Sequence, residues 1–187
     1  MAELRLETQN LIIRKLKPSD LANFLHYRSN PIIAEYQSFD VMSEESAEEF
    51  IIEQQGIDFK TGEFWSQYGI ELRSESKIIG DCAIKLDELD QRIGEIGVTI
   101  ATEYQRKGYA TEVLYQLMKF LFEEHKIHRI VETASAENSA SINLLEKIGF
   151  RKEGHFIENH FVNGKWESEV QYAMLKSEFK QATNHLK

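Results

Sequence analysis

Hydrophobic positions recur along this chain with two periods, about two residues in some segments and between three and four in others, which predict strands and helices respectively. Strands are expected over residues 11–16, 65–72, 77–86, 92–100 and 129–135. Helices are expected from Pro18 to Asn30, from Ser43 to about Phe59, from Tyr109 to about Glu124, and from Asn138 to Gly149. A final pair of strands is expected around Asn163-Gly164, because this dipeptide is typical of a two-residue hairpin turn.

This order of elements predicts a fold of the α/β (α+β) class. The sheet is expected to be mixed, mostly antiparallel and twisted, with about seven strands, and about four helices are expected to flank both of its faces. With 187 residues, the chain is most simply a single domain over residues 1–187, long enough to bury a substantial core.

Composition and charge narrow the class of protein. Hydrophobic residues make up 42% of the chain, which is typical of a globular protein. The net charge of −9 and the lack of a long basic patch argue against nucleic acid and favour cationic small molecules or basic peptides as partners. No apolar run approaches eighteen residues, so no membrane span is expected. Cys82 is the single cysteine and the N-terminus does not resemble a signal peptide, so we expect a cytoplasmic protein.

The segment from Gln105 to Ala110 is the strongest indication of chemistry. It lies between a predicted strand and the start of a predicted helix, and it combines the basic pair Arg106-Lys107 with Gly108. The first backbone N–H groups of a helix have no intrahelical partner and carry partial positive charge. A glycine at this point lets the backbone approach a ligand closely. The segment therefore predicts an anion site that suits a diphosphate, although a solvated surface turn is the simpler alternative.

Two further observations restrict the ligand. The sequence contains neither the P-loop pattern nor the dinucleotide-binding glycine pattern. Gly97 interrupts the strand over residues 92–100, and a glycine there often marks a bulge or a close backbone approach. If this strand diverges from the strand over residues 129–135, the backbone of Val98 and Ile100 becomes available to an extended ligand with amide groups. Pantetheine attached to a diphosphate nucleotide is such a ligand.

Three segments in register resemble the GNAT superfamily of acyl-CoA-dependent N-acetyltransferases. They are residues 94–100, the loop from Gln105 to Ala110, and the run from Glu137 to Phe150. The similarity is greatest to the branch that contains the ribosomal-protein N-terminal (alanine and serine) acetyltransferases. It is specific from Arg92 to Phe150, whereas residues 1–65 agree in the order of elements only.

The resemblance implies acetyl-CoA as a co-substrate and a sheet that splays at its central strands. It also implies that the strand residues Val98, Thr99 and Ile100 bind pantetheine and that Asn138 contacts the same arm, although Asn138 equally suits a helix N-cap. The implied diphosphate site consists of Gln105, Arg106, Lys107, Gly108, Tyr109, Ala110 and Thr111.

The resemblance also suggests catalytic roles. Glu95 occupies the position of a general base, although it is equally compatible with a solvated carboxylate, and Glu71, Asp81 and Glu132 are less well-placed rivals. Many family members have a tyrosine proton donor where this chain has Leu145. Ser141, one turn away, is the expected substitute in the branch that this chain resembles. Its alternative role is to bond back to a carbonyl four residues earlier.

We therefore expect an enzyme that transfers an acetyl group from acetyl-CoA to a primary amine by direct attack in a ternary complex. The acceptor is either a protein N-terminal α-amine or a small amine such as a polyamine or aminoglycoside. The alternative from another class is a non-catalytic acyl-CoA-binding module. Cys82 is expected to be a buried structural thiol, no metal site is expected, and the chain is expected to be a monomer or a homodimer.

Overall fold

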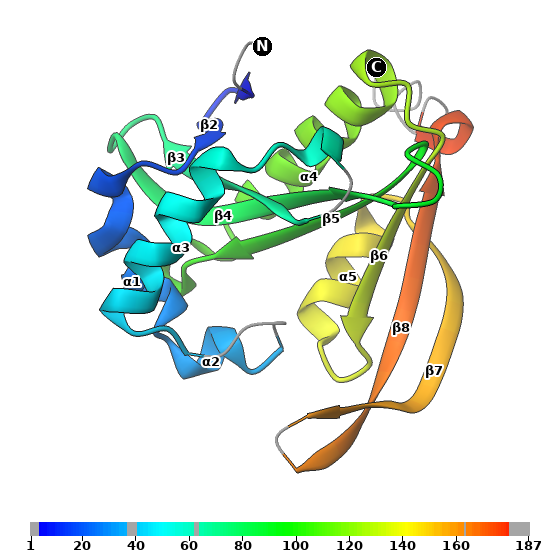
Figure 1. Ribbon diagram of the computed structural model, residues 1–187. Helices are drawn as coiled ribbons and strands as arrows, with labels where there is room; N and C mark the ends of the chain where they lie inside the picture. Colours follow the sequence, from blue (N-terminus) through cyan, green and yellow to red (C-terminus); the bar gives the residue numbers. More distant parts are fainter. Residues whose placement is uncertain (1–3, 37–40, 62–63, 163, 180–187) are drawn as a thin grey trace.

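The computed structural model describes residues 4–36, 41–61, 64–162 and 164–179, and Figure 1 shows the arrangement of their elements. The described strands form one eight-stranded sheet in the order β1-β2-β3-β4-β5-β6-β8-β7. All neighbouring pairs are antiparallel except β5 and β6. The strands are β1 (Arg5–Glu7), β2 (Leu11–Lys15), β3 (Ser66–Leu72), β4 (Lys77–Leu86), β5 (Ile93–Ile100), β6 (Arg129–Ser135), β7 (Arg151–Val162) and β8 (Lys165–Leu175).

Five labelled α-helices accompany the sheet, and a further helical turn follows β8 at residues 176–179. They are α1 (Leu21–Arg28), α2 (Pro31–Ala34), α3 (Glu44–Gly56), α4 (Tyr109–Lys119) and α5 (Ser139–Lys147). Single 3₁₀ turns occur at Pro18–Asp20, Phe59–Thr61 and Thr102–Tyr104, and α4 continues into a π-helical turn at Phe120–Glu124.

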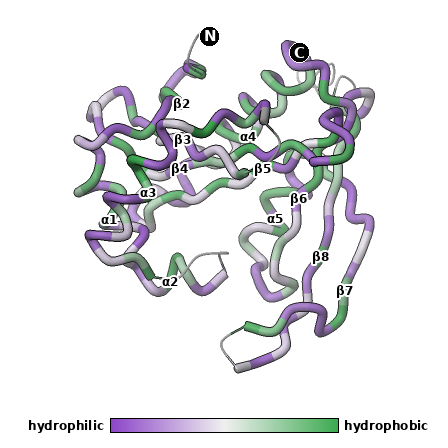
Figure 2. The backbone as a smooth tube through the Cα atoms, in the orientation of Figure 1, coloured by the Kyte–Doolittle hydropathy of each residue, from purple (hydrophilic) through white to green (hydrophobic). Residues whose placement is uncertain are grey.

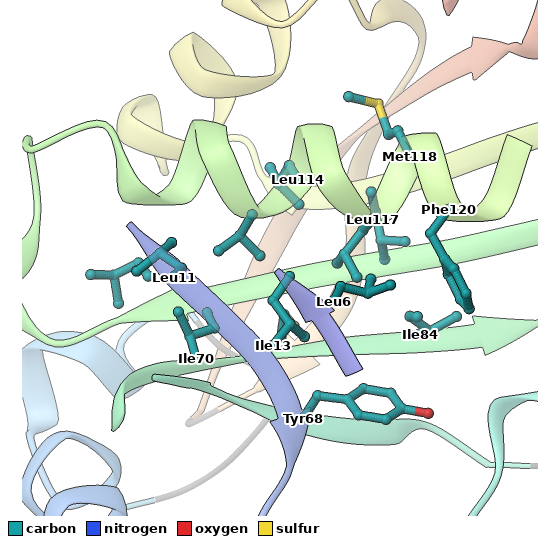
Figure 3. Packing of buried hydrophobic residues seen from close by; sticks show 14 of the residues in the cluster. Leu6, Leu11, Ile13, Tyr68, Ile70, Ile84, Leu114, Leu117, Met118 and Phe120 are labelled. Carbon is teal, nitrogen blue, oxygen red and sulfur yellow. The ribbon is translucent and has the colours of Figure 1, made fainter. Parts of the chain in front are cut away.

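The hydrophobic core lies mainly between α4 and the strands that it covers. Leu114 and Leu117 of α4 are buried against side chains of β2, β3 and β4, including Ile13, Ile70 and Ile84 (Figure 3). Asp81 lies three positions before Ile84 on β4. Because side chains alternate between the two faces of a strand, Asp81 faces the opposite side of the sheet, where it binds Arg28 of α1. The helices α1 and α4 therefore lie on opposite faces, as the sequence predicted.

Two buried arginines fix the α1 side of the sheet. The Arg28 Nη2 atom lies 2.7 Å from Asp81 Oδ1, and both side chains are almost completely buried. Arg14 on β2 binds Asp20 at 2.7 Å and Glu71 at 2.6 Å. Each charge removed from water is thus paired, as buried charges must be if the fold is to stay stable.

The sheet divides at its only parallel pair, β5 and β6. These strands pair through three positions, from Ile93 with Arg129 to Glu95 with Val131, and then diverge (Figure 1). Parallel neighbours need a crossover connection, and β5 and β6 are joined through α4. The predicted splay of the central strands is therefore present, and its vertex lies at Glu95.

Several details differ from the sequence-based expectation. The sheet has eight strands instead of about seven, because the short strand β1 has too few residues to show a periodic pattern. The bulge suggested at Gly97 is absent, since β4 and β5 keep one register from Gly80–Ile100 to Leu86–Gly94. Asn30 does not simply stop a helix; its side chain accepts a hydrogen bond from the Ile32 N–H and begins α2.

The predicted β7–β8 hairpin is present and projects from the rest of the sheet (Figure 1). Figure 2 shows hydrophobic and hydrophilic segments alternating along it. Most of β7 is exposed, including Ile157 at 75%, and Trp166 on β8 is 59% exposed. Gly164 lies in the turn with φ +80°, while Asn163, the other half of the predicted turn, lies outside the described residues.

Candidate active site

The loop before α4 has the backbone geometry of an anion site. Arg106 and Gly108 both adopt positive φ, at 59° and 88°. Gly108 is the N-cap residue of α4, and within the described chain no side chain caps its first N–H groups. Arg106, Lys107 and Gly108 are exposed, and a Cβ added at Gly108 would meet nothing within 4 Å. The amides and the positive end of the helix dipole are thus available to a phosphate group from solvent.

The flanks of this loop are held from two sides. The Lys107 ammonium lies over the Tyr104 ring at 4.9 Å from its centroid. Gln105 Nε2 donates a hydrogen bond of 2.9 Å to the Ile100 carbonyl oxygen. Gln105 therefore uses its side-chain amide within the protein, so any role toward a diphosphate would fall to its backbone.

The backbone of β5 beyond Glu95 has one free edge. The N–H of Ala101 donates to Ile79, so the odd-numbered residues of this segment direct their backbone groups toward β4. Because direction alternates along a strand, Val98 and Ile100 direct theirs toward the space between β5 and β6. Thr99, in contrast, pairs with Asp81 in the β4 register. Val98 and Ile100 thus lie on a strand edge that β6 does not pair, and the Ile100 carbonyl oxygen on this edge accepts from Gln105.

Glu95 lies at the vertex where β5 and β6 separate. It pairs in register with Lys85 on β4 and Val131 on β6. Burial raises the pKa of the Glu95 carboxyl; Lys85 opposes this shift and Asp87 adds to it. A carboxylate with a raised pKa accepts a proton more readily than a solvated one, which suits a general base.

The start of α5 places Asn138 and Ser141 side by side. The Asn138 side-chain oxygen accepts a hydrogen bond of 3.0 Å from the Ser141 N–H, so Asn138 is the N-cap residue of α5. The Ser141 hydroxyl has no hydrogen-bond partner within the described residues, so its alternative role, a bond back to the carbonyl of Glu137 four residues earlier, is not found there. Leu145, on the next turn, is buried.

A cavity of about 430 Å³ adjoins the loop at the start of α4. Thr111 and Gly108 line it together with the β1–β2 turn and Lys147 of α5. The turn is attached to α4 because Asn10 donates from its backbone and side-chain nitrogens to the Glu112 carboxylate, at 2.9 and 2.8 Å. Sequence reasoning missed this contact, since nothing in the local pattern links residues so far apart in the chain.

Neither Cys82, the register partner of Val98, nor a metal-binding group adds reactive chemistry in the described part of the chain. Cys82 is completely buried, and burial raises the pKa of its thiol well above the usual range, so the expectation of an inert structural thiol is confirmed. Among the described residues, no three His, Cys, Asp or Glu side chains are grouped as a metal site would require. None of the described helices is long and apolar enough to cross a membrane.

Comparisons with known proteins agree with this geometry. Residues 10–151 match the model of the acetyltransferase (GNAT) domain. A crystal structure of a GNAT-family acetyltransferase from Bacillus anthracis superposes with a TM-score of 0.85 and 28% identity, over 94% of this chain and 100% of the other. The chain belongs to the GNAT acetyltransferase family and is an N-acetyltransferase.

Two partial relatives differ in the acceptor that their names indicate. A Bacillus subtilis protein provisionally named as a ribosomal N-acetyltransferase is 38% identical over 51% of this chain and 54% of its own length. A spermidine N(1)-acetyltransferase from Vibrio cholerae is 29% identical over 57% of this chain and 61% of its own length.

Proposed function

We propose that this N-acetyltransferase transfers the acetyl group of acetyl-CoA to a primary amine by direct attack in a ternary complex. The observation that carries the proposal is the fork between β5 and β6, whose free edge at Val98 and Ile100 leads to the exposed N-terminus of α4. An extended pantetheine would bind the edge while its diphosphate binds the backbone from Arg106 to Ala110, with the hydroxyl of Thr111 nearby.

Glu95 is the proposed general base. The nitrogen of the amine attacks the thioester carbon, its proton passes to the Glu95 carboxylate directly or through water, and the C–S bond breaks to release an amide and CoA. Positioning of amine and thioester in one complex, together with a strand N–H near Val98 directed at the carbonyl oxygen, would supply much of the rate. Ser141, on the inward side of α5, is the proposed group at the departing sulfur.

The proposed acceptor is the α-amine of a protein or peptide. Exposed apolar side chains occur on both α2 and the β7–β8 hairpin. Ile32 on α2 is 70% exposed, and Trp166 on the hairpin is 59% exposed. The start of β8 and the end of α2 are close enough for their charges to interact. The pKa of Lys165 is raised mainly by its hydrogen bond to Glu167 and, more weakly, by the negative charges of Glu137 and Glu35. A peptide behind the reacting amine would cover these side chains, whereas a small amine would leave them in water.

Thiol release from acetyl-CoA, measured with a panel of peptides and small amines, tests the proposal. Turnover with peptides and an N-terminally acetylated product by mass spectrometry are expected. Turnover with polyamines or aminoglycosides but with no peptide would support acetyl transfer to an amine and would exclude a peptide as the acceptor. A Ser141→Ala variant is expected to lower turnover more than acetyl-CoA binding, and an equal loss of both would make Ser141 structural. Ping-pong kinetics with an acyl-enzyme would overturn direct attack.

A further inference from the structure

A second carboxyl group stands at the fork, on the opposite face of the sheet from Glu95, because Glu95 shares the face of its register partner Val131. Glu132 on β6 directly follows Val131, the residue that pairs with Glu95 in the last β5–β6 pair. It is half-buried and has neither a hydrogen bond nor an ion pair with any residue that the structure describes. Three other carboxylates that are removed from solvent differ, since Asp20, Glu71 and Asp81 each bind an arginine.

Strand register fixes the side of the sheet that Glu132 faces. Glu132 is opposite Tyr172 on the antiparallel strand β8, and residues opposite each other share a face. The Tyr172 hydroxyl donates a hydrogen bond of 2.8 Å to Glu146 on α5. Glu132 therefore lies on the face that α5 covers, and α5 also carries Ser141 and the buried Leu145.

We propose that Glu132, in its protonated form, supplies the proton that ends on the sulfur of the departing CoA. This inference rests on the proposed function. As the C–S bond breaks, its electron pair passes to sulfur, the Glu132 O–H bond breaks, and an S–H bond forms. The amine proton passes to Glu95, and solvent then restores the proton to Glu132 and removes that of Glu95, so the transfer needs no further reactant.

The surroundings of Glu132 favour the neutral acid. Burial raises its pKa well above the usual range, and the negative charge of Glu95 raises it further. The ionisable groups placed around it are Glu95 on β5, Tyr172 on β8, Glu146 on α5, which binds Tyr172, and Lys152 on β7, which lies opposite Tyr172 two strands away. Two carboxyl groups with separated pKa values around one reacting centre are a recurring arrangement for an acid and a base, and the register places these two on opposite faces of the fork.

Serine alone is a poor source of this proton. Its hydroxyl does not ionise near neutral pH, whereas a carboxyl group with a raised pKa is matched to proton transfer there. The unpartnered Ser141 hydroxyl can instead donate a hydrogen bond to sulfur without giving up its proton. The two side chains thus have separable roles, with Glu132 as the proton source and Ser141 as a hydrogen-bonding group.

The Glu132→Gln variant tests this role through the pH dependence of kcat. General acid catalysis contributes about 10²–10⁴-fold, so kcat is expected to fall by roughly 10²-fold at neutral pH. In the wild type, kcat should fall as alkaline pH deprotonates Glu132, and this fall should be absent in the variant. Glu132→Asp should restore part of kcat and the alkaline fall. Ser141→Ala should lower kcat but keep the fall.

Glu146→Gln is the matched control, because it removes a carboxylate next to the same tyrosine without touching the fork. Thermal unfolding and calorimetry with acetyl-CoA establish that the variants fold and bind. A Glu132→Gln enzyme with wild-type kcat, or with an unchanged alkaline fall, would overturn the inference while leaving the proposed transfer intact. If wild-type protein releases no thiol with any acceptor, the proposed function itself fails.

Discussion

Gln105 and Ile100 are joined across the turn between β5 and α4 by a hydrogen bond from Gln105 Nε2 to the Ile100 carbonyl oxygen, 2.9 Å long. The carbonyl belongs to the free edge of β5, and Gln105 is the residue before the positive-φ loop. One side chain therefore sets the distance between the strand edge and the anion site that follows it.

Replacing Gln105 by methionine is expected to weaken acetyl-CoA binding without unfolding the protein. Methionine has a similar length but no N–H donor, so the loop loses its link to Ile100. A single hydrogen bond contributes about 0.5–1.5 kcal/mol, which corresponds to a roughly two- to tenfold rise in Kd measured by calorimetry. The exposed Gln91→Met change serves as the control. Unchanged affinity in Gln105→Met would show that the link does not position the loop.

The Gly108→Val variant is expected to lose acetyl-CoA binding. A Cβ at this position meets no protein atom within 4 Å, so its branches would occupy the space in front of the first amides of α4. The φ of +88° is also strained for valine, which costs about 1–3 kcal/mol.

Gly164→Val separates these two effects. Gly164 has φ +80° and equally open surroundings, but it lies at the tip of the β7–β8 hairpin. Both variants should show a similar drop in Tm, whereas only Gly108→Val should lose binding by calorimetry. Near-normal affinity in Gly108→Val would exclude this loop as the diphosphate site.

Glu95→Gln is expected to reduce activity and raise stability. As a base, Glu95 must be ionised, so kcat/KM of the wild type should fall as pH drops through its raised pKa. The variant should lack this acidic fall, and its kcat/KM should be lower by about 10²-fold. The stability effect has the opposite sign. Because the folded state binds this proton more tightly, the favourable contribution is complete below the unfolded pKa of about 4.3 and is lost as pH rises through the folded pKa.

Thermal unfolding therefore tests the raised pKa of Glu95 without a measurement of activity. The glutamine variant should have a higher Tm than the wild type at pH 7, and the difference should vanish at pH 4. A lower Tm at both values would mean that the Glu95 carboxylate stabilises the fold, contrary to the burial that raises its pKa.

The buried pair Arg28 and Asp81 should be among the most sensitive positions for stability. Arg28→Met leaves the buried Asp81 carboxylate without its arginine, with Gln67 as a remaining donor at 2.6 Å. Removal of one partner of a buried pair costs about 3–5 kcal/mol. Adding Asp81→Asn should recover part of this loss in denaturant unfolding, and a double variant that is no better than Arg28→Met would argue against the pairing as the cause.

The parts of the fold that sequence predicted are those with a local signal. The loop from Gln105 to Ala110 was identifiable because a strand, a glycine and a helix start adjoin one another, and Asn138 was identifiable as a helix cap. The three-residue strand β1 and the Asn10–Glu112 contact were not, because strand pairing and long-range hydrogen bonds leave no periodic trace. Of the two possibilities raised for Gly97, the bulge is absent and the close backbone approach stays a prediction, because a glycine permits a bulge without requiring one.

The role of Glu132 shows the same limit at the site. By sequence it is only a less well-placed rival of Glu95 for the role of general base. Only the β6–β8 register places it beside Tyr172 and beneath α5, and only the fork leaves it without an arginine.

The short pairing of β5 with β6 also determines which backbone amides should change their hydrogen exchange when a ligand binds. Because the amides of Val98 and Ile100 face the fork, they should exchange with solvent deuterium faster than those of Gly97 and Thr99, which are directed toward β4. A ligand that pairs with the free edge would act as the missing neighbouring strand and slow exchange at these two amides first. Occupancy of the enzyme is thus readable, residue by residue, in the absence of turnover.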